Sequence, residues 1–251
     1  MLTALLFDVD GTLAETERDG HRNAYNAAFA EFGLDWHWDA DYYGTLLPVA
    51  GGKERLRHFI RRSGAPEADR LDVDELIGEI YATKTRLFQQ WLASDAVALR
   101  PGVARLIREA HEQGVALGVV TTTSPGNVTE LLEHQLGAGS TDWFAVIAAG
   151  DIVPAKKPAP DAYLWALAQL GAHAAECVAI EDSGIGLRSA LSAGIPTVIT
   201  VNDYTADDDF TGALAVLSDL GEPDAPYRRL DQPGSGVVDL ELLRAWLESA
   251  H

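Results

Sequence analysis

Short apolar runs that lack polar alternation recur along the chain, and each of them ends at a polar or glycine-containing turn. Runs of this kind are typical of strands in a parallel sheet that is buried on both faces. They predict five strands, at residues 4–7, 115–120, 145–149, 177–180 and 196–201.

Helical periodicity fills the stretches between these strands. It predicts helices at residues 103–113, 127–136, 161–170 and 185–193. Gly114, Gly171 and Gly194 follow three of these helices, where a glycine commonly ends a helix. The alternation of strands and helices predicts an α/β fold, a doubly wound parallel-sheet core of the Rossmann-like type.

One block interrupts this alternation directly after the first strand. From about residue 14 to residue 100 the pattern is helical, with helices expected at 16–32, 53–62 and 73–91, and it contains no convincing parallel strand. We interpret the block as an inserted all-helical cap domain. The predicted organisation is therefore a core of residues 1–13 and 101–251 and a cap of residues 14–100.

Composition and charge narrow the class of protein. The 251 residues are 47% hydrophobic, enough for a substantial core, since chains of this size bury roughly 70–75% of their unfolded surface. The 38 acidic and 19 basic residues give a formal charge of −19, which disfavours binding to nucleic acid and to anionic membranes. The segment 202–224 is acidic without any base, and we expect it to be solubilising surface.

The N-terminal segment and the cysteine content further narrow the class of protein. The apolar N-terminal run ends at Asp8, before a signal peptide or a membrane span is complete. The single cysteine, Cys177, excludes an internal disulfide and is expected to pack in the core. We expect a cytoplasmic monomer that acts on a small molecule.

Candidate chemistry gathers where the predicted strands end, which is where open α/β sheets bind ligands. The residues placed there are Asp8, Asp10, Thr121, Thr122, Thr123, Ser124, Lys157, Glu181 and Asp182. Carboxylates this close together oppose joint ionisation, and a hard divalent cation resolves the conflict. An all-oxygen shell suits Mg2+, while the lysine and the hydroxyls would hold an anionic substrate against it.

Four motifs at these positions resemble those of the haloacid dehalogenase superfamily. They are Asp8-Val9-Asp10-Gly11-Thr12-Leu13, Thr121, Lys157-Pro158-Ala159-Pro160-Asp161 and Glu181-Asp182-Ser183-Gly184. The helical insert resembles the cap of the branch that contains β-phosphoglucomutase and small sugar phosphatases. Segments of that insert, among them Gly51-Gly52-Lys53-Glu54-Arg55, further resemble the CbbY-type phosphatases of autotrophic organisms.

The resemblance implies a mechanism and a substrate. Asp8 would attack phosphorus to form an aspartyl-phosphate, and Asp10 would act as the general acid and then the general base. Mg2+ would be held by the Asp8 side chain, the Asp10 carbonyl and Asp182, with Glu181 acting through water. Thr121, the Thr122 amide and Lys157 would bind the transferring phosphoryl group. The implied substrate is xylulose 1,5-bisphosphate, a misfire product and inhibitor of Rubisco.

The cap offers further candidates for substrate binding. Glu17 and His21 lie four residues apart on a helix, where they would either contact sugar hydroxyls or form a surface pair that stabilises the helix. The Gly51–Gly52 turn, followed by Glu54, would present Lys53 and Arg55 to the phosphate that is not transferred. Lys84 is a weaker candidate for contact with the substrate.

Alternative functions remain open on the sequence alone. A phosphosugar mutase would use the same aspartyl-phosphate but pass the phosphoryl group to a second sugar hydroxyl instead of water. A catalytically idle binding protein is disfavoured because no catalytic position is missing. A dehalogenase would share the fold without needing Mg2+ or a phosphate pocket around Lys157.

Overall fold

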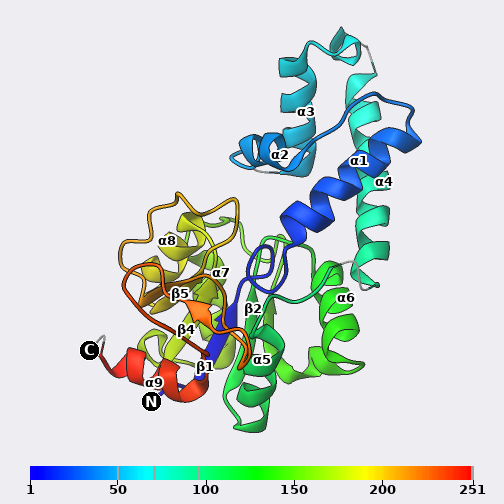
Figure 1. Cartoon of the computed structure of the whole chain (residues 1–251). Helices are drawn as coiled ribbons and strands as arrows, with labels where there is room; N and C mark the ends of the chain where they lie inside the picture. Colours follow the sequence, from blue (N-terminus) through cyan, green and yellow to red (C-terminus); the bar gives the residue numbers. More distant parts are fainter. Residues whose placement is uncertain (50, 70–71, 95–96, 250–251) are drawn as a thin grey trace. The chain divides into compact units, whose positions relative to one another are not determined.

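The computed structural model describes residues 1–49, 51–69, 72–94 and 97–249 and divides the chain into two compact units. The core unit consists of Met1–Glu15 and Ala98–His251, and the helical unit of Thr16–Val97. Figure 1 shows the strands in the first unit and helices alone in the described part of the second. No helix in the described part of the chain combines the length and the apolar composition that a membrane span requires.

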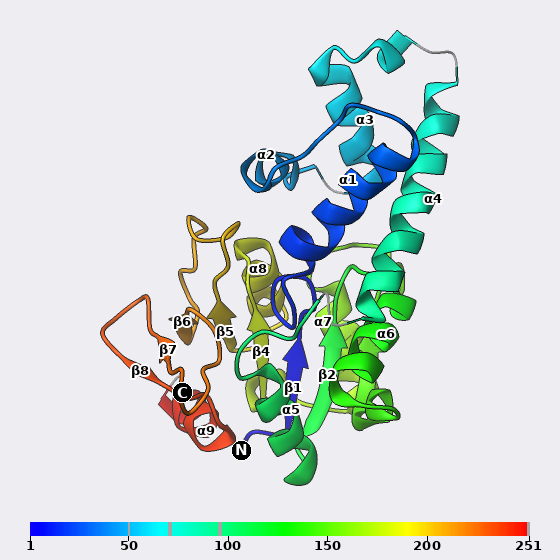
Figure 2. The ribbon, with the colours of Figure 1, turned by 45° about the vertical axis from the view of Figure 1, so that its right-hand side comes forward.

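A parallel sheet of six strands forms the centre of the core unit, in the order β3-β2-β1-β4-β5-β6. Figure 2 shows neighbouring strands of this sheet side by side. The strands are β1 (Ala4–Phe7), β2 (Ala116–Val120), β3 (Phe144–Ala148), β4 (Cys177–Glu181), β5 (Thr197–Thr200) and β6 (Ala215–Leu217). The predicted doubly wound core is therefore confirmed, with its five strands placed within two residues of their expected bounds.

The sixth strand corrects one expectation. β6 lies inside segment 202–224, which we expected to be solubilising surface, but Ala215 and Leu217 are fully buried. They are buried because β6 pairs with β5 and extends the sheet. A short antiparallel pair, β7 (Tyr227–Arg228) and β8 (Ser235–Gly236), follows it.

Helices connect the strands and cover the sheet. They are α5 (Val103–Glu112), α6 (Pro125–Leu136), α7 (Asp161–Leu170), α8 (Gly184–Ser192) and the C-terminal α9 (Leu240–Ser249), which packs against α5. Short 3-10 turns precede β3 at Ser140–Trp143 and β4 at Ala174–Glu176. The helix α9 was not among the predicted elements.

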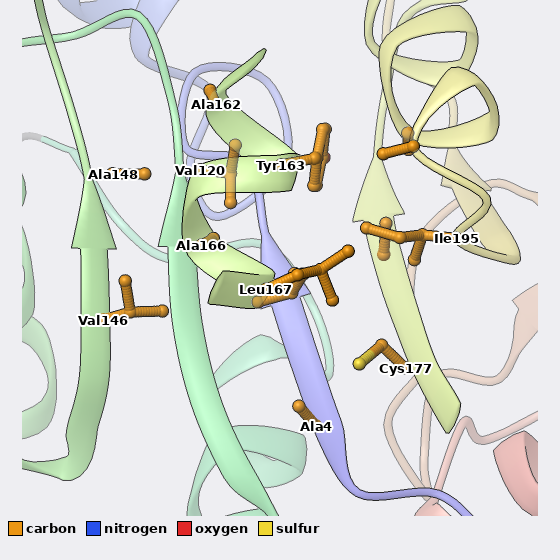
Figure 3. Close-up of a cluster of buried hydrophobic side chains, with 14 residues drawn as sticks. Ala4, Val120, Val146, Ala148, Ala162, Tyr163, Ala166, Leu167, Cys177 and Ile195 are labelled. Atoms are coloured by element: carbon orange, nitrogen blue, oxygen red, sulfur yellow. The ribbon is translucent and has the colours of Figure 1, made fainter. Parts of the chain in front are cut away.

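The apolar core explains why the strands read as continuous hydrophobic runs. Figure 3 shows side chains of α7, among them Ala166 and Leu167, facing the strands, with Cys177 in the same cluster as expected. Ala4 and Leu6 of β1 belong to this cluster, while the alternating Leu5 is fully buried and points to the other face. Burial on both faces leaves no position in the strand for a polar residue.

The strand order places a switch point beside β1. The chain leaves β1 toward β2 and β3 and then crosses back to form β4 on the other side of β1. Phe7 is in register with Val119 of β2 and with Ile180 of β4. The residues that follow these three positions therefore converge at the carboxyl ends of the strands, where such sheets bind ligands.

Arg100 fixes the loop after β1 relative to β5 and β6. The guanidinium is buried and pairs with Glu15 at 3.0 Å. It also donates to four backbone carbonyl oxygens, those of Gly11, Thr200, Val201 and Ser218. A buried carbonyl without a donor is costly, so one side chain here satisfies groups from three segments of the core unit.

The helical unit has its own aromatic core. Its elements are a π-helical turn at Thr16–His21, α1 (Arg22–Glu31), α2 (Ala40–Leu46), α3 (Gly52–Ser63), a 3-10 turn at Pro66–Asp69 and α4 (Val73–Leu92). Trp38 is fully buried, with its ring 4.7 Å from that of Tyr25 and 4.9 Å from that of Phe29. The helix α2 was not predicted. The side chain of Asp39 caps it by accepting from the Tyr42 backbone N–H.

Candidate active site

Lys157 lies at the centre of the group of residues that the strand ends bring together. Its Nζ donates to Asp8 Oδ1 at 2.7 Å, to Glu181 Oε1 at 2.6 Å and to the backbone oxygen of Val120 at 2.8 Å. Asp8 follows β1, Val120 ends β2 and Glu181 ends β4. Only 7% of the lysine side chain is exposed, so a single buried cation joins three strand ends.

Tyr163 is a member of this group that the sequence analysis did not find. Its hydroxyl donates to Glu181 Oε1 at 2.6 Å, and its ring lies 5.3 Å from Lys157 Nζ. Tyr163 is fully buried on α7, which begins four residues after Lys157. A tyrosine on the otherwise apolar buried face of a helix is the one signal that could have indicated it.

Asp182 adds a third carboxylate. Ligand oxygens of Asp8, Glu181 and Asp182 lie within 4.8 Å of one another, and all three residues are buried. Burial raises the pKa of Asp8 from about 3.8 to about 7, against the opposing effect of Lys157, and Glu181 adds to the rise. Burial and the Asp8 carboxylate likewise raise the pKa of Asp182.

The charges of this group are unbalanced in a way that fits a divalent cation. Three buried carboxylates face one buried ammonium group, and burial alone would lower the pKa of Lys157. The carboxylates of Asp8 and Glu181 outweigh burial and hold that pKa above its ordinary value. Carboxylate oxygens are hard donors of the kind that Mg2+ accepts, and a cation among them would relieve their mutual repulsion.

The loop after β1 has a glycine that the site requires. Gly11 has a φ of +87°, and a Cβ there would lie 2.4 Å from Asp182 Oδ2. The turn therefore lets the backbone approach the carboxylate closely. Asp10, one residue earlier, is half-buried, and its side chain is not one of the three carboxylates that could share an ion in the described part of the chain.

Hydroxyl groups follow β2 on the other side of β1. Thr121 is buried, and its Oγ1 accepts from the Thr123 amide at 3.2 Å. Thr123 Oγ1 in turn accepts from the side-chain Nδ2 of Asn127. The Ser124 hydroxyl accepts from the backbone N–H of Asn127 and so caps α6. Thr122 and Ser124 are exposed. Thus the predicted hydroxyl residues occupy the turn between β2 and the first residues of α6.

The candidates of the helical unit form a second group within that unit. Arg55 Nη1 donates to the Tyr43 hydroxyl at 2.6 Å, and that hydroxyl donates to Glu17 Oε2 at 2.6 Å. Arg55 and Glu17 also form an ion pair at 3.6 Å. Among the described residues, the buried Arg55 Nε has no hydrogen-bond partner. Glu17 is therefore engaged with Arg55 and Tyr43 and not with His21.

His21 and Lys84 meet on the same unit. Lys84 Nζ lies 2.8 Å from His21 Nδ1, and because an ammonium group only donates, this histidine nitrogen accepts. Lys84 is buried, with Nζ 5.1 Å from the Tyr25 ring and 5.0 Å from the Phe88 ring.

The start of α3 lies beside these residues. The Tyr25 hydroxyl donates to the Gly52 carbonyl at 2.9 Å. Lys53 is exposed, with Nζ 5.6 Å from the Tyr81 ring. Glu54 is also exposed, and its carboxylate folds back over Gly51, where a Cβ would lie 2.2 Å from Oε2. Lys53 is thus an exposed basic side chain in the first turn of α3, next to Gly51 and Gly52.

The chain is similar to known proteins over most of its length. A family model for haloacid dehalogenase-like hydrolases matches residues 2–194. The plasmid-borne protein CbbY of Cupriavidus necator is 51% identical over 247 residues, 98% of this chain and 96% of that protein. A CBBY-like protein of Arabidopsis thaliana is 40% identical, over 91% of this chain and 72% of that protein.

A solved structure is similar as well. The crystal structure of a mutant CbbY from Rhodobacter sphaeroides in complex with xylulose-(1,5)bisphosphate has a TM-score of 0.76. Its sequence is 44% identical, and the alignment covers 87% of this chain and 95% of that one.

The raised pKa of Asp8 predicts a pH dependence of stability. A carboxyl group whose pKa rises on folding stabilises the fold below its unfolded pKa and loses that contribution as the pH rises through its folded pKa. The metal-free protein should therefore become less stable between about pH 4 and pH 7. Added Mg2+ should raise the melting temperature little at pH 5 and most above pH 7, where it need not displace a proton.

Thermal unfolding with and without Mg2+ across this pH range checks the prediction. An Asp8→Asn variant is the control, since it lacks the titrating carboxyl group and should show a flatter metal-free profile. An equal effect of Mg2+ on the wild-type melting temperature at pH 5 and pH 8 would contradict the assignment.

Proposed function

The chain belongs to the haloacid dehalogenase-like hydrolase family, as its four motifs predict, and from this premise we propose that it is a Mg2+-dependent sugar-bisphosphate phosphatase. The proposed substrate is xylulose 1,5-bisphosphate and the product xylulose 5-phosphate. The observation that carries the proposal is the buried Asp8 carboxylate held by Lys157 at the switch point of the sheet. The likeness to CbbY over almost the whole chain supports the choice of substrate.

Asp8 is the proposed nucleophile. One of its carboxylate oxygens attacks phosphorus, a P–O bond to Asp8 forms, and the bond from phosphorus to the sugar oxygen breaks. The Lys157 contact to Oδ1 leaves the second oxygen for this attack and favours the ionised carboxylate that the attack requires.

Asp10 is the proposed general acid and base. It donates a proton to the departing sugar oxygen and then takes a proton from the water that attacks the aspartyl-phosphate, which releases inorganic phosphate and restores Asp8. Its position two residues after Asp8, where it is half-buried, supports this assignment.

The transferring phosphoryl group needs fixed donors and cations for its spread charge. We assign this task to Lys157, the Thr121 hydroxyl and the Thr122 amide, with Thr123 and Ser124 forming the rest of the turn. The Asp8 side chain, the Asp10 carbonyl and Asp182 would hold Mg2+, with Glu181 acting through water. When bound, Mg2+ supplies positive charge that balances the carboxylates and the phosphoryl oxygens.

The helical unit is the proposed source of substrate binding beyond the reacting phosphate. Lys53 and Arg55 are assigned to the second phosphate, and Glu17, His21 and Lys84 to the sugar. Because Arg55 is already engaged with Tyr43 and Glu17, its replacement would also disturb those partners. Lys53 is exposed, which makes it the cleaner position for a test.

An assay of phosphate release tests the proposed activity. With Mg2+, we expect release of phosphate from xylulose 1,5-bisphosphate and no interconversion of sugar monophosphates. An Asp8→Asn variant should fall below about a thousandth of the wild-type rate, because an amide cannot form the aspartyl-phosphate and nucleophile removal elsewhere has cost far more.

Two results would overturn this assignment. Interconversion of sugar monophosphates without net phosphate release would identify a mutase. Activity of Asp8→Asn above a thousandth of wild type, in a variant whose circular dichroism and melting temperature match wild type, would remove Asp8 from the role of nucleophile.

The second phosphate gives a prediction for Lys53. A charge-assisted contact contributes about 1.5–3 kcal/mol, so Lys53→Met should lower kcat/KM for the bisphosphate roughly 10- to 150-fold. A sugar monophosphate has no second phosphate for Lys53 to contact, so its hydrolysis should change less than about twofold. Arg57→Met on the same helix is the matched control, since Arg57 pairs with Asp74. Equal losses for both substrates would exclude Lys53 from phosphate binding.

A further inference from the structure

Asn202, two residues after the end of β5, contacts one of the clustered carboxylates. Its Nδ2 donates to Asp182 Oδ2 at 2.6 Å and lies 3.5 Å from the Gly11 carbonyl oxygen. We propose that Asn202 is a positioning residue that orients the Asp182 carboxylate for the divalent cation. The inference rests on the proposed function, since it concerns the cation that the reaction would use.

The orientation of the Asn202 amide follows from its surroundings. Its Oδ1 accepts from the Tyr204 backbone N–H at 2.9 Å, so the other end of the amide, which faces Asp182, carries the two hydrogens. A flipped amide would place an oxygen against the Asp182 carboxylate and an NH2 group against a backbone N–H. The side chain therefore acts as a donor toward Asp182 in one defined orientation.

The backbone of Asn202 is also held in place. Its N–H donates to Thr205 Oγ1 at 3.1 Å, and the Thr205 N–H donates to its carbonyl at 3.2 Å. Arg100 donates to the preceding carbonyl, that of Val201, at 2.6 Å. With its backbone fixed on both sides, the short asparagine side chain has little freedom to leave Asp182.

This arrangement divides the two oxygens of Asp182 between two tasks. Asn202 holds Oδ2, whereas Oδ1 receives only the distant Thr12 hydroxyl at 3.5 Å among the described hydrogen bonds. A carboxylate with one oxygen bound to a fixed donor presents its other oxygen in a defined direction. Donors of this kind orient ligands in metal sites, and their loss typically costs about 10- to 100-fold in metal affinity or activity.

Close packing around the Asn202 amide leaves no room for a side chain at Gly11. A Cβ at Gly11 would lie 2.5 Å from Asn202 Nδ2 and 2.4 Å from Asp182 Oδ2. The amide, the carboxylate and the glycine backbone are therefore in direct contact. Three segments, the loop after β1, the end of β4 and the end of β5, meet at this one amide group.

The test replaces the donor while keeping the turn. In Asn202→Ser, the hydroxyl can still accept from the Tyr204 N–H, as serine does in turns of this kind, but it is too short to reach Asp182. We expect the Kd for Mg2+, measured by isothermal titration without substrate, to rise about 10- to 100-fold. The Mg2+ concentration for half-maximal activity should rise similarly, while kcat at saturating Mg2+ falls less.

Thr205→Val is the matched control. It removes the hydroxyl that holds the Asn202 backbone N–H but leaves the amide that contacts Asp182. Its Kd for Mg2+ should stay within about twofold of wild type, even if its melting temperature falls. Asn202→Ala serves as a second variant of the donor should Asn202→Ser fold poorly.

The outcomes separate the inference from the proposed function. If wild type binds Mg2+ and the folded Asn202 variants bind it equally well, Asn202 is a turn residue and the inference alone fails. An equal loss of affinity in Thr205→Val would overturn it as well, since the loop and not the amide would then matter. If wild-type protein binds no Mg2+, the proposed function fails and the inference falls with it.

Discussion

The buried ammonium group of Lys157 and its three oxygen partners determine how the strand ends of the core unit meet. A cation with little exposure is stable only where its hydrogens find acceptors, and here these come from the loop after β1 and from the ends of β2 and β4. The ring of Tyr163 covers the same group. The positions of Asp8 and Glu181 are therefore coupled through one side chain.

One ammonium group does not balance the carboxylates that surround it. Burial and mutual repulsion raise the pKa of Asp8 and of Asp182. Folding thus places acids where they are less stable than in water, as proteins do at functional sites. Two neighbouring residues limit this cost by donating hydrogen bonds to the carboxylates. Tyr163 donates to Glu181, and Asn202 donates to Asp182. Under the proposed function, the remaining carboxylate oxygens would hold the cation.

Most of the core could be predicted from the sequence because its signals are local. Buried parallel strands require unbroken apolar runs, and Asp8, Lys157 and Glu181 stand immediately beyond or between such runs. β6 was missed because it has three residues within an acidic segment and its burial depends on pairing with β5. Tyr163 and Asn202 were missed for a related reason. Their roles come from contacts with residues 18 and 20 positions away, which no local pattern reveals.

The helical unit shows the same limit. The turn at Gly51 and the basic residues after it are visible in the sequence, but the engagement of Arg55 with Tyr43 and Glu17 depends on how α2 and α3 pack. The spacing of Glu17 and His21 on one helix left open whether they contact the sugar or pair with each other. In the structure each has a different partner, because the aromatic core places Tyr43 beside Glu17 and Lys84 beside His21.

The central claim is that a phosphoryl group passes through Asp8. Mixing the enzyme with xylulose 1,5-bisphosphate and Mg2+, quenching in acid within one turnover and measuring the intact mass tests it most directly. We expect a transient adduct of one phosphoryl group, which peptide mapping places on Asp8 and which disappears as phosphate is released. Release of phosphate with no adduct on Asp8 at any time within the turnover would contradict it.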